Sequence, residues 1–111
     1  MAGSKGGGER RDREEHYRRA ALAHPLRREI LRLMPEDGEA EAVGIAAELA
    51  AVPGHIAYHL RVLRTCGALQ GVAKDPPAPP HFRPAPQAPW VRKMLAEFDE
   101  RDREDDQGGR D

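Results

Sequence analysis

Three polar residues, His55, Tyr58 and Arg61, recur at helical spacing within PGHIAYHLRVLRTCG, residues 53–67. On a helical wheel they fall opposite an apolar face, so they meet solvent while that face packs. Arg61 can donate to guanine acceptors, and His55 or Tyr58 can hydrogen-bond to a base or pack on it. We predict that this face reads base edges in DNA; the alternative is an ordinary solvated face.

Phosphate contacts form a second set of candidates around this segment. Gly54 and Ala57 lack bulk, which would let the backbone approach a phosphate, although a turn glycine and a packing alanine fit equally well. Basic or titratable side chains follow at the helix end and in the next segment. We predict phosphate contacts, which give affinity without sequence choice, from Arg64, Lys74, His81 and Arg83.

No signal for catalysis or metal binding accompanies these residues. His55 and His59 have a spacing that can bind a metal, but no acidic or thiol partner stands nearby. We therefore interpret His59 as a structural histidine and Cys66 as a packing residue, and expect neither metal nor cofactor. The chain has no phosphate-binding loop and no nucleophile elbow, so we do not expect an enzyme.

The elements that position these residues are mostly helices. Helices are predicted over 43–50 and 53–66, joined by a tight turn, and Gly67 suits the left-handed position that ends the second helix. An amphipathic helix over 25–34 precedes them. Its apolar stripe comprises Leu26, Ile30, Leu33 and Met34.

A short hairpin and a last helix are predicted to follow. Residues 68–73 and 81–83 read as antiparallel strands around a proline-rich loop, because proline cannot donate ladder hydrogen bonds. A further amphipathic stripe then contains Trp90, Val91, Met94, Leu95 and Phe98. Together these elements predict a mainly α fold with a small β wing, a winged helix-turn-helix.

Length and charge divide the chain into three parts. Its 111 residues suffice for one small domain, predicted over 9–99, after a flexible Gly/Ser-rich stretch at 1–8 and before an acidic disordered tail at 100–111. The net charge is −1, yet residues 70–93 hold four Lys/Arg and one Asp, a net +3. A nucleic-acid protein needs local rather than total positive charge.

The single cysteine, Cys66, cannot form a disulfide within one chain, which favours a reducing compartment. No apolar run approaches the roughly 20 residues that span a bilayer, and the first residues lack the apolar core of a secretory signal. We expect a cytoplasmic protein with no membrane partner. The abundance of Arg, Ala, Gly and Pro is typical of a GC-rich bacterial genome.

Two segments add a family resemblance. ALAHPLRREILRLM resembles the opening helix of ArsR-like (arsenic-repressor-type) regulators, and IAYHLRVLRTCGAL resembles their recognition helix. The resemblance implies a homodimeric transcriptional regulator that binds double-stranded operator DNA. Many members bind metal through cysteines near the first helix of the pair, where this chain has none. Ala57 also replaces a frequent serine, and the wing tip is proline-rich rather than basic.

In the resembling family the terminal helices form the dimer. We therefore predict a dimer interface, with packing on the protomer's own core as the alternative, at Tyr17, Leu22, Trp90, Met94 and Phe98.

Two other functions stay open. The acidic stretch over 35–69 would suit a winged helix that has become a protein-interaction module, and an unknown effector bound at the dimer interface would make the protein a ligand-responsive sensor.

Overall fold

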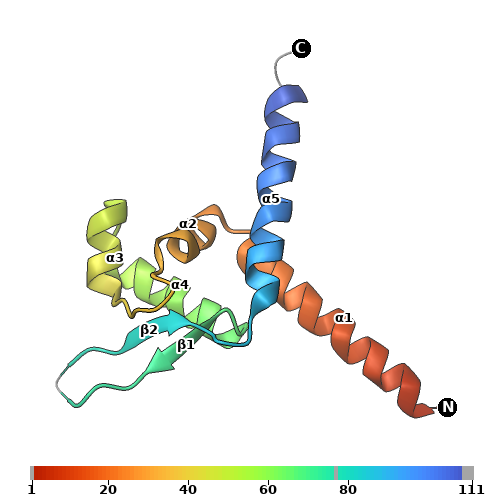
Figure 1. Cartoon of the computed structure of the whole chain (residues 1–111), viewed down its shortest axis with the longest axis horizontal. Helices are drawn as coiled ribbons and strands as arrows, with labels where there is room; N and C mark the ends of the chain where they lie inside the picture. The colour runs from red at the N-terminus through yellow and green to blue at the C-terminus, as the bar shows by residue number, and fades with distance from the viewer. Residues whose placement is uncertain (1, 77, 109–111) are drawn as a thin grey trace.

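The computed structural model describes residues 2–76 and 78–108, with side chains over 10–76 and 78–104. A compact centre carries a projecting hairpin and two helices that extend away from it in different directions (Figure 1). This arrangement confirms the predicted mainly α fold with a small β wing. The elements are α1 (Ala2–Leu22), α2 (Pro25–Leu33), α3 (Ala42–Leu49), α4 (Pro53–Thr65), β1 (Leu69–Val72), β2 (His81–Pro84) and α5 (Pro89–Gly108).

The start of α2 follows from its first residues. Pro25 occupies the first helical position, where its missing N–H costs nothing. The His24 side chain caps the helix, since its Nδ1 accepts a hydrogen bond from the Leu26 amide at 3.2 Å. Of the predicted apolar stripe on α2, Ile30 and Met34 are buried but Leu33 is 40% exposed. The predicted burial of Leu33 is wrong, because this residue lies at the edge of the packed face.

The turn between α3 and α4 is short and closed by its backbone. Ala50 adopts a left-handed conformation with φ of 52°, and the Ala51 amide donates to the Ala46 carbonyl at 2.9 Å. Pro53 then begins α4. At the other end of α4, Gly67 has φ of 91°, as its sequence position predicts. The two helices therefore form the expected helix-turn-helix.

The wing is a two-stranded antiparallel sheet, with Gln70 opposite Arg83 and Gly71 opposite Phe82. A single bridge adds a third segment, since Ala40 and Phe82 exchange two backbone hydrogen bonds of 2.8 Å. The loop before α3 is thereby attached to the outer side of β2. This contact was not predicted, because a one-residue bridge leaves no pattern in the sequence.

The core lies where α1, α2, α4 and α5 meet. Its fully buried side chains are Leu22, Ile30, Ile56, Leu60 and Leu63. No helix within the described residues is long and apolar enough to cross a membrane.

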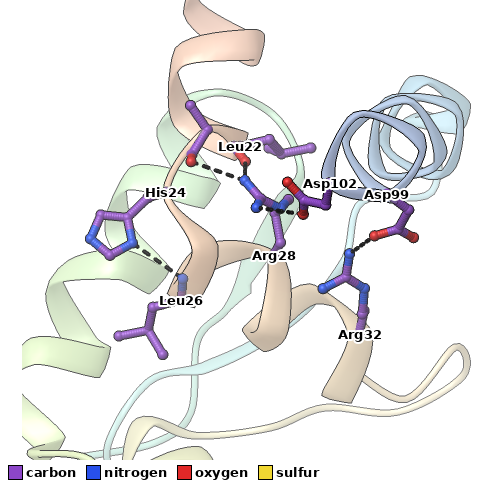
Figure 2. A network of polar contacts seen from close by, with 8 residues as sticks. Leu22, His24, Leu26, Arg28, Arg32, Asp99 and Asp102 are labelled. Atoms are coloured by element: carbon purple, nitrogen blue, oxygen red, sulfur yellow. Dashed lines mark hydrogen bonds and ion pairs between the residues drawn. The ribbon is translucent and has the colours of Figure 1, made fainter. Parts of the chain in front are cut away.

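A buried arginine ties α1, α2 and α5 together (Figure 2). Arg28 donates to the carbonyls of Leu22 at 2.8 Å and Ala23 at 2.9 Å, which are free at the end of α1. Its guanidinium also lies 3.4 Å from the Asp102 carboxylate and 4.7 Å from the Phe98 ring centroid.

Both terminal helices extend past the expected domain boundaries. α5 continues to Gly108, and Asp102 is in contact with Arg28 although it lies inside the predicted tail. A second ion pair, Arg32 with Asp99, strengthens the same contact (Figure 2). α1 begins at Ala2 instead of Glu9. This N-terminal extension includes Gly6, Gly7 and Gly8, and glycine disfavours a helix.

Candidate nucleic-acid interface

α4 presents the predicted polar face to solvent. His55, Tyr58 and Arg61 are all exposed, whereas Ile56 and Leu60 on the opposite face are completely buried. Tyr58 is 53% exposed, so its ring is accessible from solvent. The arrangement provides one aromatic ring, one imidazole and one guanidinium along the same helix face.

The buried side of α4 is fixed by a histidine. His59 is 8% exposed, and its Nδ1 accepts a hydrogen bond from Arg27 Nε at 3.1 Å. The His24 ring lies against it, with ring centroids 4.6 Å apart. Burial lowers the pKa of His59, and the charges of His24, Arg27 and His55 lower it further. The imidazole is therefore neutral, and its hydrogen bond within the domain fits the predicted structural role.

Arg27 also supports the exposed face. Its guanidinium lies 6.0 Å from the Tyr58 ring centroid while it bonds His59 and the Ala21 carbonyl. The edge of Tyr58 faces the His59 ring at a centroid distance of 5.4 Å. A residue of α2 thus lies beside both His59 and Tyr58 of α4. The sequence gives no signal for this role, because Arg27 resembles its neighbouring arginines.

Gly54 and Ala57 are the small residues that were predicted to let a phosphate approach the backbone at the start of α4. Gly54 is exposed, and a Cβ built on it would meet nothing within 4 Å. Ala57 is half-buried one turn further along. The helix start therefore carries no bulky side chain at Gly54 that would keep a ligand from the backbone.

Arg64 connects α4 with the wing. Its Cδ lies 3.3 Å from the position that a Cβ on Gly71 would occupy, so the missing side chain of Gly71 makes room for it. Across the wing, Arg83 Nε donates to Gln70 Oε1 at 2.8 Å, and both side chains are exposed. Two guanidinium groups therefore lie along the path from α4 to the hairpin.

The other two predicted phosphate contacts are occupied by carboxylates. Lys74 Nζ lies 2.7 Å from Glu39 Oε1. His81 lies between two acids, with Nδ1 3.4 Å from Glu39 and Nε2 3.7 Å from Glu41. Sequence reasoning missed both glutamates. Their spacing, one residue apart in E-A-E, matches two side chains on the same face of a strand.

Three of the five predicted dimer residues lie inside the protomer. Leu22, Met94 and Phe98 are no more than 7% exposed and belong to its core. The expectation that they face a partner must be revised, because their side chains have almost no free surface. Tyr17 is 71% exposed, and Trp90 is half-buried with the Arg18 guanidinium 4.8 Å from its ring.

An open groove of about 960 Å³ runs between α1 and α4, and its walls include Tyr17, Tyr58 and Cys66. Burial raises the pKa of the Cys66 thiol, which also donates to the Leu63 carbonyl at 3.3 Å. A protonated, hydrogen-bonded thiol is a poor nucleophile, which fits a packing role. No group of three or more His, Cys, Asp or Glu side chains among the described residues could hold a metal ion.

Comparisons with known proteins identify the class. Residues 24–70 match the family described as bacterial regulatory protein, arsR family. No match was found among curated proteins. The homodimeric winged helix-turn-helix DNA-binding domain of a possible ArsR-family regulator from Mycobacterium bovis shares 21% identity over 82% of this chain and 80% of that chain, with a TM-score of 0.64.

Two further solved structures share the fold. Reduced HlyU from Vibrio cholerae has 18% identity and a TM-score of 0.62, covering 83% of this chain and 92% of its own. An ArsR-like transcriptional regulator from Rhodococcus sp. RHA1 has 26% identity and a TM-score of 0.57, covering 85% of this chain and 91% of that one.

The helix-turn-helix, its hairpin and the closing helix define a winged helix-turn-helix protein. The segment over residues 24–70 matches the model of the arsR family of bacterial regulatory proteins, and the related solved structures share the fold of the chain. Its class is that of a DNA-binding transcriptional regulator, not an enzyme.

Proposed function

We propose that the protein is a homodimeric regulator that inserts α4 into the major groove of its operator. The exposed face of His55, Tyr58 and Arg61 is the observation that carries this proposal. A guanidinium can donate two hydrogen bonds to a guanine, and imidazole and phenol groups can bond or pack on neighbouring bases. This face would supply the choice of sequence.

Phosphate contacts would come from the residues around this face. Gly54 and Ala57 leave the start of α4 open to the DNA backbone, and Arg64 and Arg83 extend the positive charge toward the wing. Such contacts fix the orientation of the protein on the duplex and make its affinity depend on salt.

The terminal helices would form the dimer. α1 and α5 extend beyond the core in Figure 1, and Tyr17 and Trp90 on these helices retain free surface. The related domain from Mycobacterium bovis is homodimeric. A twofold pair would place its two α4 helices about one DNA turn, roughly 34 Å, apart and would favour a palindromic operator. Such a regulator would work in the bacterial cytoplasm, where the chromosome lies.

Selection from a pool of random-sequence duplexes tests this function. The purified protein is expected to enrich a palindromic motif whose half-sites are centred about 10 base pairs apart. Enrichment of a single unrepeated half-site would contradict the dimer. Failure to enrich any motif at low salt would contradict the regulator itself and favour a protein-interaction module.

A further inference from the structure

The loop before α3 brings two acidic residues to the wing. Ala40 is hydrogen-bonded through its backbone to Phe82 of β2, which places Glu39 and Glu41 on either side of it. Residues two apart in an extended chain point to the same side. The two carboxylates accordingly reach Lys74, near the start of the hairpin loop, and His81, the first residue of β2 after the loop.

Each of these carboxylates contacts a basic or titratable group of the wing. Glu39 is 2.7 Å from Lys74 and 3.4 Å from His81, and Glu41 is 3.7 Å from the other nitrogen of His81. The hydrogen bond from Lys74 is the main reason why the pKa of Glu39 is lowered. Glu39 is therefore ionised at neutral pH and offers Lys74 the kind of oxygen that a phosphate would offer.

Little positive charge is left on the wing for DNA. Within residues 69–76 and 78–84 the lysine, histidine and arginine side chains are Lys74, His81 and Arg83. The loop between the strands adds Asp75 and prolines. Since Lys74 is paired with Glu39 and His81 lies between Glu39 and Glu41, Arg83 is the basic side chain of this described part that remains available, and its only hydrogen bond there is to the neutral Gln70.

We propose that Glu39 and Glu41 limit the DNA affinity of the wing by occupying Lys74 and His81, so that Lys74 makes no phosphate contact in the complex. The two glutamates act as internal substitutes for phosphate. DNA binding then depends on α4. Loss of the negative charge of Glu39 would release Lys74 and allow the wing to contact a phosphate. This inference rests on the proposed function.

Salt-dependent DNA binding by four proteins tests the inference: the wild type, E39Q, K74Q and the double variant E39Q/K74Q. Each phosphate contact adds about 0.9 to the slope of log K against log salt, which corresponds to about eightfold in affinity at 0.1 M salt. E39Q is expected to gain up to about 0.9 in slope, or about eightfold in affinity, for each wing that contacts DNA. K74Q should bind within twofold of the wild type, and E39Q/K74Q should return to the wild-type slope.

The matched control is E48Q, because Glu48 is an exposed acid on α3 without a described ion pair. It removes the same charge and should leave the slope unchanged. An E39Q protein with the wild-type slope, or a K74Q protein that loses a full contact, would overturn the inference while leaving the function intact. If neither the wild type nor any variant bound DNA, the proposed function would fail and the inference with it.

A measurement without DNA checks the ion pair itself. In an NMR titration of the free protein, K74Q is expected to move the pKa of Glu39 upward, since its main stabilising partner is gone. An unchanged Glu39 titration would show that Lys74 is not held by Glu39 in solution and would also overturn the inference.

Discussion

The position of the exposed face of α4, formed by His55, Tyr58 and Arg61, depends on the imidazole of His59. His59 bonds Arg27 of α2, packs against His24 and lies beside Tyr58. Since its Nδ1 accepts the bond from Arg27, the proton of the neutral ring is on Nε2. A second proton on Nδ1 would break the bond and bring two positive charges together. The orientation of α4 on α2 is therefore linked to the neutral form of His59.

This linkage predicts a pH dependence of stability. Because the folded-state pKa of His59 is lowered, the unfolded chain binds the proton more strongly. Its contribution to stability is complete above the unfolded value of about 6.5 and is lost as the pH falls below it. Urea unfolding between pH 7.5 and 5.5 should show this loss in the wild type and a smaller one in His59→Gln. Equal losses in both proteins would contradict the assignment.

At the scale of the element, Arg28 of α2 connects α1 and α5 through hydrogen bonds and an ion pair. Replacing it with Met would leave the Leu22 and Ala23 carbonyls without their bonds. Since hydrogen bonds to charged groups contribute about 1.5–3 kcal/mol each, the loss of these two bonds is expected to lower the free energy of unfolding by about 3–6 kcal/mol. Chemical denaturation measures it. Arg101→Met, which changes an exposed arginine over the same Phe98 ring, should cost less than about 0.5 kcal/mol.

Gly67 after α4 and Gly44 within α3 offer a matched pair of glycine substitutions. Gly67→Ala should destabilise the protein by about 1–2 kcal/mol, because its φ of 91° is strained for a residue with a Cβ. Gly44→Ala, inside α3 with nothing within 4 Å of the added Cβ, should instead stabilise it by about 0.5–1 kcal/mol. Thermal unfolding of both variants separates the two. The same sign for both changes would be inconsistent with the described backbone.

Local patterns predicted the elements well and the contacts between distant elements poorly. Ile56, Leu60 and Leu63 recur at helical spacing, which revealed both faces of α4 before the fold was known. The Arg28–Asp102 pair joins residues 74 positions apart, and neither residue differs from other charged residues nearby. Such pairs depend on how α5 crosses α2, and this crossing leaves no periodicity in the sequence.

The same reason explains which contacts the sequence did not predict at the proposed interfaces. Lys74 and His81 were predicted to contact phosphates because their charge was visible, whereas the glutamates beside them came from a separate loop. Met94 and Phe98 share a stripe with Trp90, and the sequence alone could not tell whether this stripe faces the core or a partner.

At the scale of the whole molecule, the terminal helices form an extended surface. The molecule measures 50 × 49 × 24 Å, and α1 and α5 account for its reach beyond the core (Figure 1). If these helices form the dimer, Tyr17→Ala should weaken dimerisation at least tenfold, since exposed tyrosines are frequent interface anchors. Analytical ultracentrifugation measures the dissociation constant. Val43→Ala, at an exposed apolar residue of α3, should leave it unchanged, and equal effects would place the interface elsewhere.

The central claim is that the exposed face of α4 reads DNA sequence. Fluorescence anisotropy with a duplex from the protein's own promoter region and a shuffled duplex, over a salt series, tests it most directly. The wild type should prefer the promoter duplex, and Arg61→Ala should lose about 1–3 kcal/mol of that preference. Arg101→Ala, at an exposed arginine of α5, should retain it. Equal preference in the wild type and Arg61→Ala would contradict the claim.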